Sequence, residues 1–373
     1  MNNPVLLFVL GTRPEAIKCA PVIRACQEDA ALTTRVLTTS QHRQIQDEVL
    51  HFFGITPDHD LDLMGKNPNL TALIANAWTG LSQYLQEQPA DLLLVQGDTS
   101  TAFIAALTAQ YQKIPVAHIE AGLRTHDKSM PFPEEINRRL IGCIADLHFA
   151  PTEQARENLL KVNIEPSAIH VVGNSGIDAL LYMRRHAESH PREVPIPAAE
   201  KSLLVTCHRR ENWGKNIENL CQALHTLCQE NPRVSIVFLV HPNPMVSKPV
   251  QRHLGGIPNI TLLNAVNYRQ MAYYLNAADV VLTDSGGIQE EAPVLGKPVL
   301  VLRDKTERPE GVKQHSAILT GTDPAAIVKH ATRLLNDSAY YKSHAKEAMH
   351  YGDGKTAQRI LNQIRTYFSL PRR

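Results

Sequence analysis

Residues 5–26 read VLLFVLGTRPEAIKCAPVIRAC, and this stretch decides the fold class. Its first six residues, Val5 to Leu10, form a continuous apolar run, which predicts a buried strand. A loop beginning at Gly11 follows, and Pro14 opens a segment with helical spacing of apolar residues that reaches Cys26. A strand, a short loop and a helix in this order are the repeating unit of an α/β protein with a parallel sheet.

The same alternation recurs along the rest of the chain. In the first half, further strands are expected at residues 34–38, 92–95, 116–119, 147–149 and 169–172, with helix-like segments such as 70–86 and 101–111. A polar stretch with Pro191, Pro195 and Pro197 interrupts the pattern, because proline neither continues a helix nor sits in a central strand. The pattern then restarts, with strands expected at residues 203–206, 234–240, 260–263, 280–283 and 299–302.

These patterns predict two doubly wound, Rossmann-like α/β domains that face a central cleft. We expect a first domain at 1–172, a connection at 173–200, a second domain at 201–355 and a last helix at 356–368 that joins the first domain. The length of 373 residues agrees with this division at roughly 150 residues per domain. Open α/β sheets bind ligands beyond the carboxyl ends of their strands, so the loops after strands are the candidate sites.

The composition excludes several classes of protein. Lys and Arg total 38 and Asp and Glu total 37, so no overall field would hold nucleic acid or an anionic membrane. The six cysteines form no C-x-x-C pair and no zinc-like spacing with histidines, which predicts free thiols in a reducing cytoplasm and no metal site. The run Val5 to Leu10 is too short for a signal peptide, and no apolar run has the length of a membrane span.

The loop Gly11–Lys18, GTRPEAIK, has the features of an anion site. Its helix start offers free N–H groups, and Arg13 and Lys18 add positive charge. The dinucleotide fingerprint G-x-G-x-x-G would need glycines where Arg13 and Ala16 stand, which argues against a nicotinamide cofactor. An ordinary strand-to-helix turn with solvated cations is the alternative.

Three carboxylates lie in loops after expected strands of the first domain. Asp98 follows the strand at 92–95, Glu120 follows the strand at 116–119, and Glu134 lies later in the same loop as Glu120. Asp98 could instead cap a helix, and Glu134 could pair with Arg138 four residues later. Three acids at one edge of the sheet exceed what caps require, so we interpret them as an acid/base set.

His208 follows the strand at 203–206 in the stretch Cys207–Asn212, CHRREN. With two arginines beside it, this histidine can hold a phosphate or protonate a leaving group. A structural histidine in a hydrogen-bonded loop is the alternative.

The stretch at 284–293, DSGGIQEEAP, is the most specific in the chain. The residues Ser285–Gly287 at a helix start allow backbone N–H groups to approach a phosphate closely. Glu291 lies one helical turn further on, within reach of ribose hydroxyls, and Arg308 follows the next strand, where it can face a diphosphate.

Across residues 5–365 the chain carries, in order, the blocks GTRPEAIK, GDTS, EAGLRT, PFPEE with NRR, HRREN, TDSGGIQEEAPVLGKPV and RDKTERPEG. Together these blocks resemble the bacterial non-hydrolysing UDP-N-acetylglucosamine 2-epimerases. The resemblance implies the GT-B arrangement of two Rossmann-like domains, with UDP in the cleft. It also implies a cytoplasmic, homodimeric isomerase without a cofactor, which converts UDP-N-acetylglucosamine reversibly to UDP-N-acetylmannosamine for cell-surface polysaccharide.

The resemblance assigns roles residue by residue. It places binding of the nucleotide and substrate at Arg13, Lys18, Ser285, Gly286, Gly287, Glu291 and Arg308. It places catalysis at Asp98, Glu120, Glu134 and His208. A second UDP-N-acetylglucosamine, bound as an activator, is implied at Gln41, Gln44 and His241. The chain departs from the common pattern at Gln96, where a histidine often precedes GDT.

The chemistry accounts for the need for several acids. C2 of N-acetylglucosamine is not adjacent to a carbonyl, so its proton leaves only with a change at C1. Elimination of UDP to a 2-acetamidoglucal, followed by re-addition, needs proton carriers on both faces of the ring. Three alternatives remain open: a hydrolysing 2-epimerase that releases N-acetylmannosamine and UDP, a GT-B glycosyltransferase, and a non-catalytic nucleotide-sugar sensor.

Overall fold

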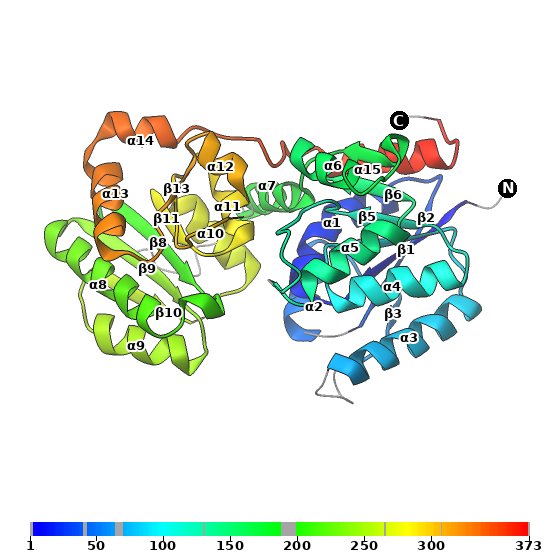
Figure 1. Cartoon of the computed structure of the whole chain (residues 1–373), viewed down its shortest axis with the longest axis horizontal. Helices are drawn as coiled ribbons and strands as arrows, with labels where there is room; N and C mark the ends of the chain where they lie inside the picture. The colour runs from blue at the N-terminus through cyan, green and yellow to red at the C-terminus, as the bar shows by residue number, and fades with distance from the viewer. Residues whose placement is uncertain are drawn as a thin grey trace. The chain divides into compact units, whose positions relative to one another are not determined.

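A computed structural model describes residues 3–39, 43–63, 70–129, 131–187, 199–264, 266–306 and 308–371, with the backbone alone at 43–47 and 187. The chain divides into two units, which are labelled by element in Figure 1. One unit joins Met1–Ala179 to Tyr351–Arg373, and the other is Leu180–His350. Their boundary falls inside helix α7 (Ser175–Ala187).

The first unit is built on a parallel sheet with strand order β3-β2-β1-β4-β5-β6-β7. Its strands are β1 (Val5–Leu10), β2 (Thr33–Thr38), β3 (His59–Asp60), β4 (Leu92–Gln96), β5 (Val116–Ile119), β6 (Leu147–Ala150) and β7 (Ile169–Val171). Its other helices are α1 (Arg13–Gln27), α2 (Arg43–Phe52), α3 (Leu70–Glu87), α4 (Ser100–Tyr111), α5 (Glu134–Ile144), α6 (Glu153–Leu160), the 3₁₀ turn η1 (Pro166–Ala168) and α15 (Thr356–Tyr367). The strand order reverses direction between β1 and β4, and this reversal point is where such sheets bind ligands.

The central strands of the first sheet are apolar along their length because helices cover both faces. In β1, Leu7 and Val9 belong to a core shared with helices α3 and α4. Leu6, Phe8 and Leu10 alternate with them and are equally buried, on the face where α1 contacts β1 and β4. Helix α15 packs on α1 within the same unit.

The second unit has a parallel sheet with strand order β10-β9-β8-β11-β12-β13. The strands are β8 (Lys201–Cys207), β9 (Val234–Val240), β10 (Ile260–Leu263), β11 (Val280–Thr283), β12 (Val299–Val301) and β13 (Ala317–Leu319). The helices are η2 (Arg210–Asn212), α8 (Lys215–Glu230), α9 (Pro244–Leu254), α10 (Tyr268–Ala277), α11 (Gly286–Val294), α12 (Pro309–Lys313), α13 (Pro324–Asn336) and α14 (Ser338–His344). Here the strand order reverses between β8 and β11.

The two Rossmann-like sheets confirm the expected α/β fold class. Every expected strand is present, with bounds that differ by at most two residues. The short strands β3 and β13 are additional, since two or three residues carry no readable alternation. The expected connection contains helix α7, whose buried Ile177, Leu180 and Met183 follow helical spacing. Pro191, Pro195 and Pro197 lie outside the described residues.

In the described part of the chain, every helix is too short or too polar to cross a membrane.

Candidate active site

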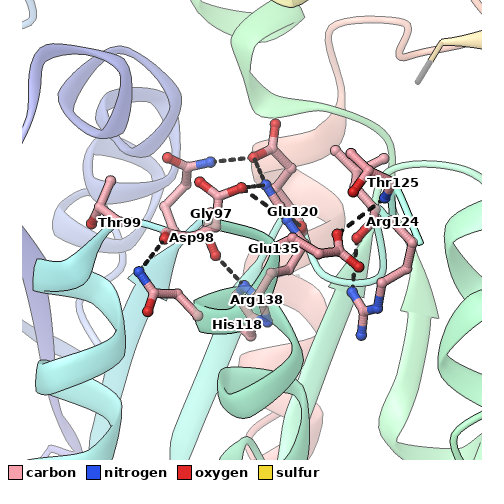
Figure 2. A network of polar contacts seen from close by, with 12 residues as sticks. Gly97, Asp98, Thr99, His118, Glu120, Arg124, Thr125, Glu135 and Arg138 are labelled. Atoms are coloured by element: carbon pink, nitrogen blue, oxygen red, sulfur yellow. Dashed lines mark hydrogen bonds and ion pairs between the residues drawn. The ribbon is translucent and has the colours of Figure 1, made fainter. Parts of the chain in front are cut away.

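The loops after β1, β4 and β5 meet at one edge of the first sheet. These three strands are neighbours and run parallel, so their carboxyl ends lie side by side. Gly11 follows β1, Asp98 comes two residues after β4, and Glu120 follows β5 directly. Figure 2 shows the polar network at this edge, to which helix α5 contributes Arg138.

Glu120 is the most buried of the three expected acids, with 6% of its surface exposed. Its carboxylate is ion-paired with Lys18 and accepts a hydrogen bond of 2.7 Å from Gln96 Nε2. Its backbone has a φ of 65°, which is unusual for a residue other than glycine. Arg138 Nη1 donates to the Glu120 carbonyl at 2.5 Å, which helps to hold this left-handed conformation.

Arg138 connects two of the expected catalytic acids. Its Nε and Nη2 donate to Asp98 Oδ2 at 3.1 and 2.5 Å, and Nη2 lies 3.4 Å from Glu120 Oε2. The guanidinium is only 7% exposed, and a buried cation between two acids keeps both of them close without direct repulsion. The alternative, in which Arg138 pairs with Glu134, finds no support in these contacts, because the guanidinium binds Asp98 and Glu120 at the strand ends.

Glu134 is the first residue of α5 and has a different environment. Its Oε2 is buried and has no hydrogen-bond partner among the described residues. Buried carboxylate oxygens are almost always paired, so an unpaired one is unusual. Glu134 thus differs from its neighbour Glu135, which binds Arg139 at 2.7 Å and accepts from the Thr125 N–H.

Buried His118 and half-buried Thr99 make contacts beside Asp98, and neither was expected as a site residue. His118, on β5, makes a hydrogen bond of 2.7 Å from its Nε2 to the Gly97 carbonyl oxygen, and burial lowers the pKa of His118 to about 3. A neutral imidazole therefore fixes the residue before Asp98. On the other side, Thr99 Oγ1 donates to Glu15 Oε1 at 2.7 Å.

Glu15 joins the first loop to the loop that carries Asp98. Besides Thr99, it accepts from the N–H groups of Gly11 at 3.1 Å and Thr12 at 2.6 Å. Burial raises the pKa of Glu15 to about 7, although these hydrogen bonds lower it. Thr12 and Glu15 have the spacing of a capping box, and that signal was available in the sequence.

The pKa of Glu15 predicts a dependence of stability on pH. Because its pKa is raised in the folded state, Glu15 contributes fully to the free energy of unfolding below its ordinary pKa of 4.5. This contribution to stability is lost as pH rises to about 7. Glu15→Gln does not titrate. We expect the free energy of unfolding of the wild type, relative to this variant, to fall by about 3 kcal/mol between pH 4 and pH 8 in urea titrations. A difference that stays constant or rises with pH would contradict this assignment.

In the second unit, His208 follows β8 and Asp284 follows the adjacent β11. Asp284 is fully buried and lies 2.9 Å from His208 Nδ1. It also accepts from the N–H groups of His208 and Arg209 and from Asn212 Nδ2, at 2.9 Å each. Burial raises the pKa of Asp284, but the bonds from His208, Arg209 and Asn212 outweigh it and hold this pKa at about 2.

At the start of helix α11, backbone N–H groups lie beside the guanidinium of Arg308. Ser285 is its N-cap residue, and Gly286 and Gly287 are its first helical residues, so their N–H groups have no partner within the helix. A Cβ at Gly286 would lie 2.9 Å from Cζ of Arg308, so only glycine lets this guanidinium pack on the helix start. Glu290 accepts from Arg308 Nε at 2.8 Å and fixes its position. A helix N-terminus with a packed guanidinium suits a diphosphate.

The remaining expected residues are distributed over both units. Glu291 accepts from the Tyr268 hydroxyl at 3.2 Å, and His241 follows β9 at the same sheet edge as His208. Arg13 is the first residue of α1. Gln41 lies outside the described residues, as does the side chain of Gln44. Lys18, expected near the nucleotide, is placed beside Glu120.

The structure adds positioning groups that the sequence did not identify. They are Arg138, Gln96, His118, Glu15, Asp284 and Glu290. Within the described ranges, no cluster of three or more His, Cys, Asp or Glu residues has the arrangement of a metal site.

The chain is similar over nearly its whole length to one family of known proteins. The family model described as UDP-N-acetylglucosamine 2-epimerase matches residues 24–365. A probable UDP-N-acetylglucosamine 2-epimerase of Ralstonia solanacearum is 46% identical, over 98% of this chain and 99% of the relative. The UDP-N-acetylglucosamine 2-epimerase of Escherichia coli K12 is 45% identical, over 96% and 98%.

Solved structures agree with this relationship. The UDP-GlcNAc 2-epimerase of Neisseria meningitidis, whose crystal structure has UDP-GlcNAc bound, superposes with a TM-score of 0.90 at 41% identity, covering 97% of this chain and all of the other. Both the matched length and the identity exceed what a shared fold alone would give. The chain belongs to the UDP-N-acetylglucosamine 2-epimerase family.

Proposed function

We propose that this enzyme interconverts UDP-N-acetylglucosamine and UDP-N-acetylmannosamine by elimination of UDP and re-addition to a 2-acetamidoglucal. The observation that carries the mechanism is the pair of acids Asp98 and Glu120, which Arg138 joins at one edge of the first sheet, with Glu134 one helical turn before Arg138 on α5. One acid takes the C2 proton, and another returns a proton to the opposite face of the ring.

The environments of the three acids differ, which suits groups with different proton-transfer roles. Glu120 is enclosed by Lys18, Gln96 and Arg138, whereas Glu134 keeps one buried oxygen unpaired. In this proposal Glu120 and Asp98, which share the cation Arg138, are the proton acceptors. Glu134 is the proton carrier for the opposite face of the ring.

The second unit acts on the departing diphosphate. Negative charge grows on the leaving oxygen as the bond from C1 to oxygen breaks, and fixed donors that meet this charge lower the barrier. Arg308, His208 and the N–H groups at the start of α11 are donors of this kind. Glu291 is assigned to the ribose hydroxyls.

Three further assignments come from the resemblance and complete the proposal. The enzyme is a cytoplasmic homodimer whose product feeds cell-surface polysaccharide synthesis. UDP-N-acetylglucosamine also binds as an activator through Gln41, Gln44 and His241. Kinetics started from UDP-N-acetylmannosamine alone test the last point, because trace UDP-N-acetylglucosamine should then abolish a lag phase.

A proton NMR time course with UDP-N-acetylglucosamine tests the reaction. We expect the anomeric signal of UDP-N-acetylmannosamine to appear and reach a constant ratio to substrate, without build-up of free sugar. Steady release of UDP with N-acetylmannosamine would instead establish the hydrolysing reaction. Release of UDP only in the presence of an acceptor would establish a glycosyltransferase.

A further inference from the structure

In the second unit, the buried carboxylate of Asp284 contacts one ring nitrogen of His208. Asp284 has no exposed surface, and its Oδ1 lies 2.9 Å from Nδ1 of His208. The two residues follow neighbouring strands, and the register pairs Thr206 with Thr283, so the backbone itself brings them together. The imidazole is 46% exposed on its other sides.

The Asp284 carboxylate accepts hydrogen bonds from N–H groups of the backbone and of a side chain. Oδ2 accepts from the N–H groups of His208 and Arg209 and from the Asn212 amide, at 2.9 Å each. Oδ1 accepts from His208 N–H at 3.1 Å and faces Nδ1. The low pKa of Asp284 agrees with a carboxylate that is ionised and acts only as an acceptor.

An acceptor-only partner fixes which nitrogen of the histidine carries a hydrogen. Nδ1 must be the donor toward Asp284, which leaves Nε2 as the nitrogen that can meet a ligand. Asp284 therefore determines both the orientation of the His208 ring and the nitrogen that it presents.

We infer that Asp284 is a positioning residue for the reaction, acting through His208. By holding Nδ1–H, it keeps Nε2 of His208 as the nitrogen that meets the diphosphate as UDP leaves and returns. The inference rests on the proposed function for the role of His208, but the tautomer it requires is a property of the protein without substrate.

The isosteric variant Asp284→Asn provides the test. An amide has one acceptor and one donor group, and three donors face Oδ2, so the amide nitrogen is expected at the Oδ1 position, against Nδ1. His208 would then carry its hydrogen on Nε2, and Nε2 would no longer be free to take up a proton. We expect kcat to fall by about 10-fold or more with a smaller change in KM, because the lost interaction strengthens in the transition state.

Nitrogen-15 NMR of the histidine rings reads the tautomer directly. In the wild type, His208 should show a hydrogen on Nδ1, and in Asp284→Asn the hydrogen should move to Nε2. A wild-type ring with hydrogen on Nε2 alone would overturn the inference, whatever the activity. If the tautomer is as expected but no UDP-sugar is interconverted, the proposed function fails while the placement of His208 stands.

A double-variant cycle separates positioning from loop stability. If Asp284 acts through His208, the variant His208→Asn and the double variant with Asp284→Asn should have the same kcat within about twofold. If the loss of kcat in the double variant were instead the product of the losses in the two single variants, the inference would be overturned. Asn212→Ala is the matched control, because Asn212 donates to the same carboxylate and to the Leu302 carbonyl without touching the ring. It should lower Tm and leave the tautomer of His208 unchanged.

Discussion

The variants Asp98→Asn, Glu120→Gln and Glu134→Gln are each expected to lower kcat by about 100-fold or more while the protein stays folded. An amide of the same shape keeps most contacts but neither takes up nor releases a proton at neutral pH. Glu134→Gln is the cleanest of the three, because the buried Oε2 of Glu134 has no protein partner to lose in the described structure. Turnover and Tm should be measured on the same preparations.

Glu135→Gln is the matched control for these variants. Glu135 is the next residue on α5 and is also buried, but its partners are Arg139 and the Thr125 N–H. We expect a lower Tm and nearly normal kcat. If the three site variants behaved like this control, losing stability while keeping turnover, the acids would be helix caps and loop anchors.

His208→Asn and Arg308→Met should each lower kcat by roughly 100-fold or more. Both residues are assigned to the departing diphosphate, and a charge-assisted bond that strengthens in the transition state affects kcat more than KM. For Arg308→Met the neighbouring Glu290 also loses its cation, so Tm should fall as well. Steady-state kinetics in both directions measure the effect.

Arg333→Met serves as the control for loss of one positive charge in the second unit. Arg333 is exposed on α13 and pairs with Asp337, at 3.5 Å, four residues on. This variant should have wild-type kcat and KM. Normal turnover in His208→Asn would show that the histidine is a structural part of the loop.

The fold could be predicted because parallel strands buried on both faces are continuous apolar runs. Val5–Leu10 and Val234–Val240 are examples, and both strands have the predicted bounds. The positions of Asp98, Glu120 and His208 after strands were also readable, since each lies within three residues of the end of an apolar run.

The partners of these residues could not be predicted, because they depend on which strands are neighbours. Asp98 and Arg138 are 40 residues apart, and His208 and Asp284 are 76 apart. Local spacing favoured an ion pair between Glu134 and Arg138, but the buried acids across the strand ends bind the guanidinium instead. Helix α7 was missed because the prolines beyond it suggested a connection throughout.

Gln96 departs from the family pattern, and the structure shows which residue its side chain contacts. In the sequence it is only a residue before GDT where a histidine is common. In the structure its amide donates to Glu120 at 2.7 Å. A neutral donor thus contacts the acid in this enzyme, at a place where a histidine would carry a titratable ring.

The incorporation of solvent deuterium at C2 tests the central claim most directly. With UDP-N-acetylglucosamine in D₂O and no added nicotinamide cofactor, the proton taken from C2 and the proton returned to the opposite face belong to different, solvent-exchanging groups. We therefore predict that deuterium appears at C2 of UDP-N-acetylmannosamine at the rate of epimerisation, as read by proton NMR and mass spectrometry. Full retention of the original hydrogen at C2 of the product would contradict elimination and re-addition through these acids.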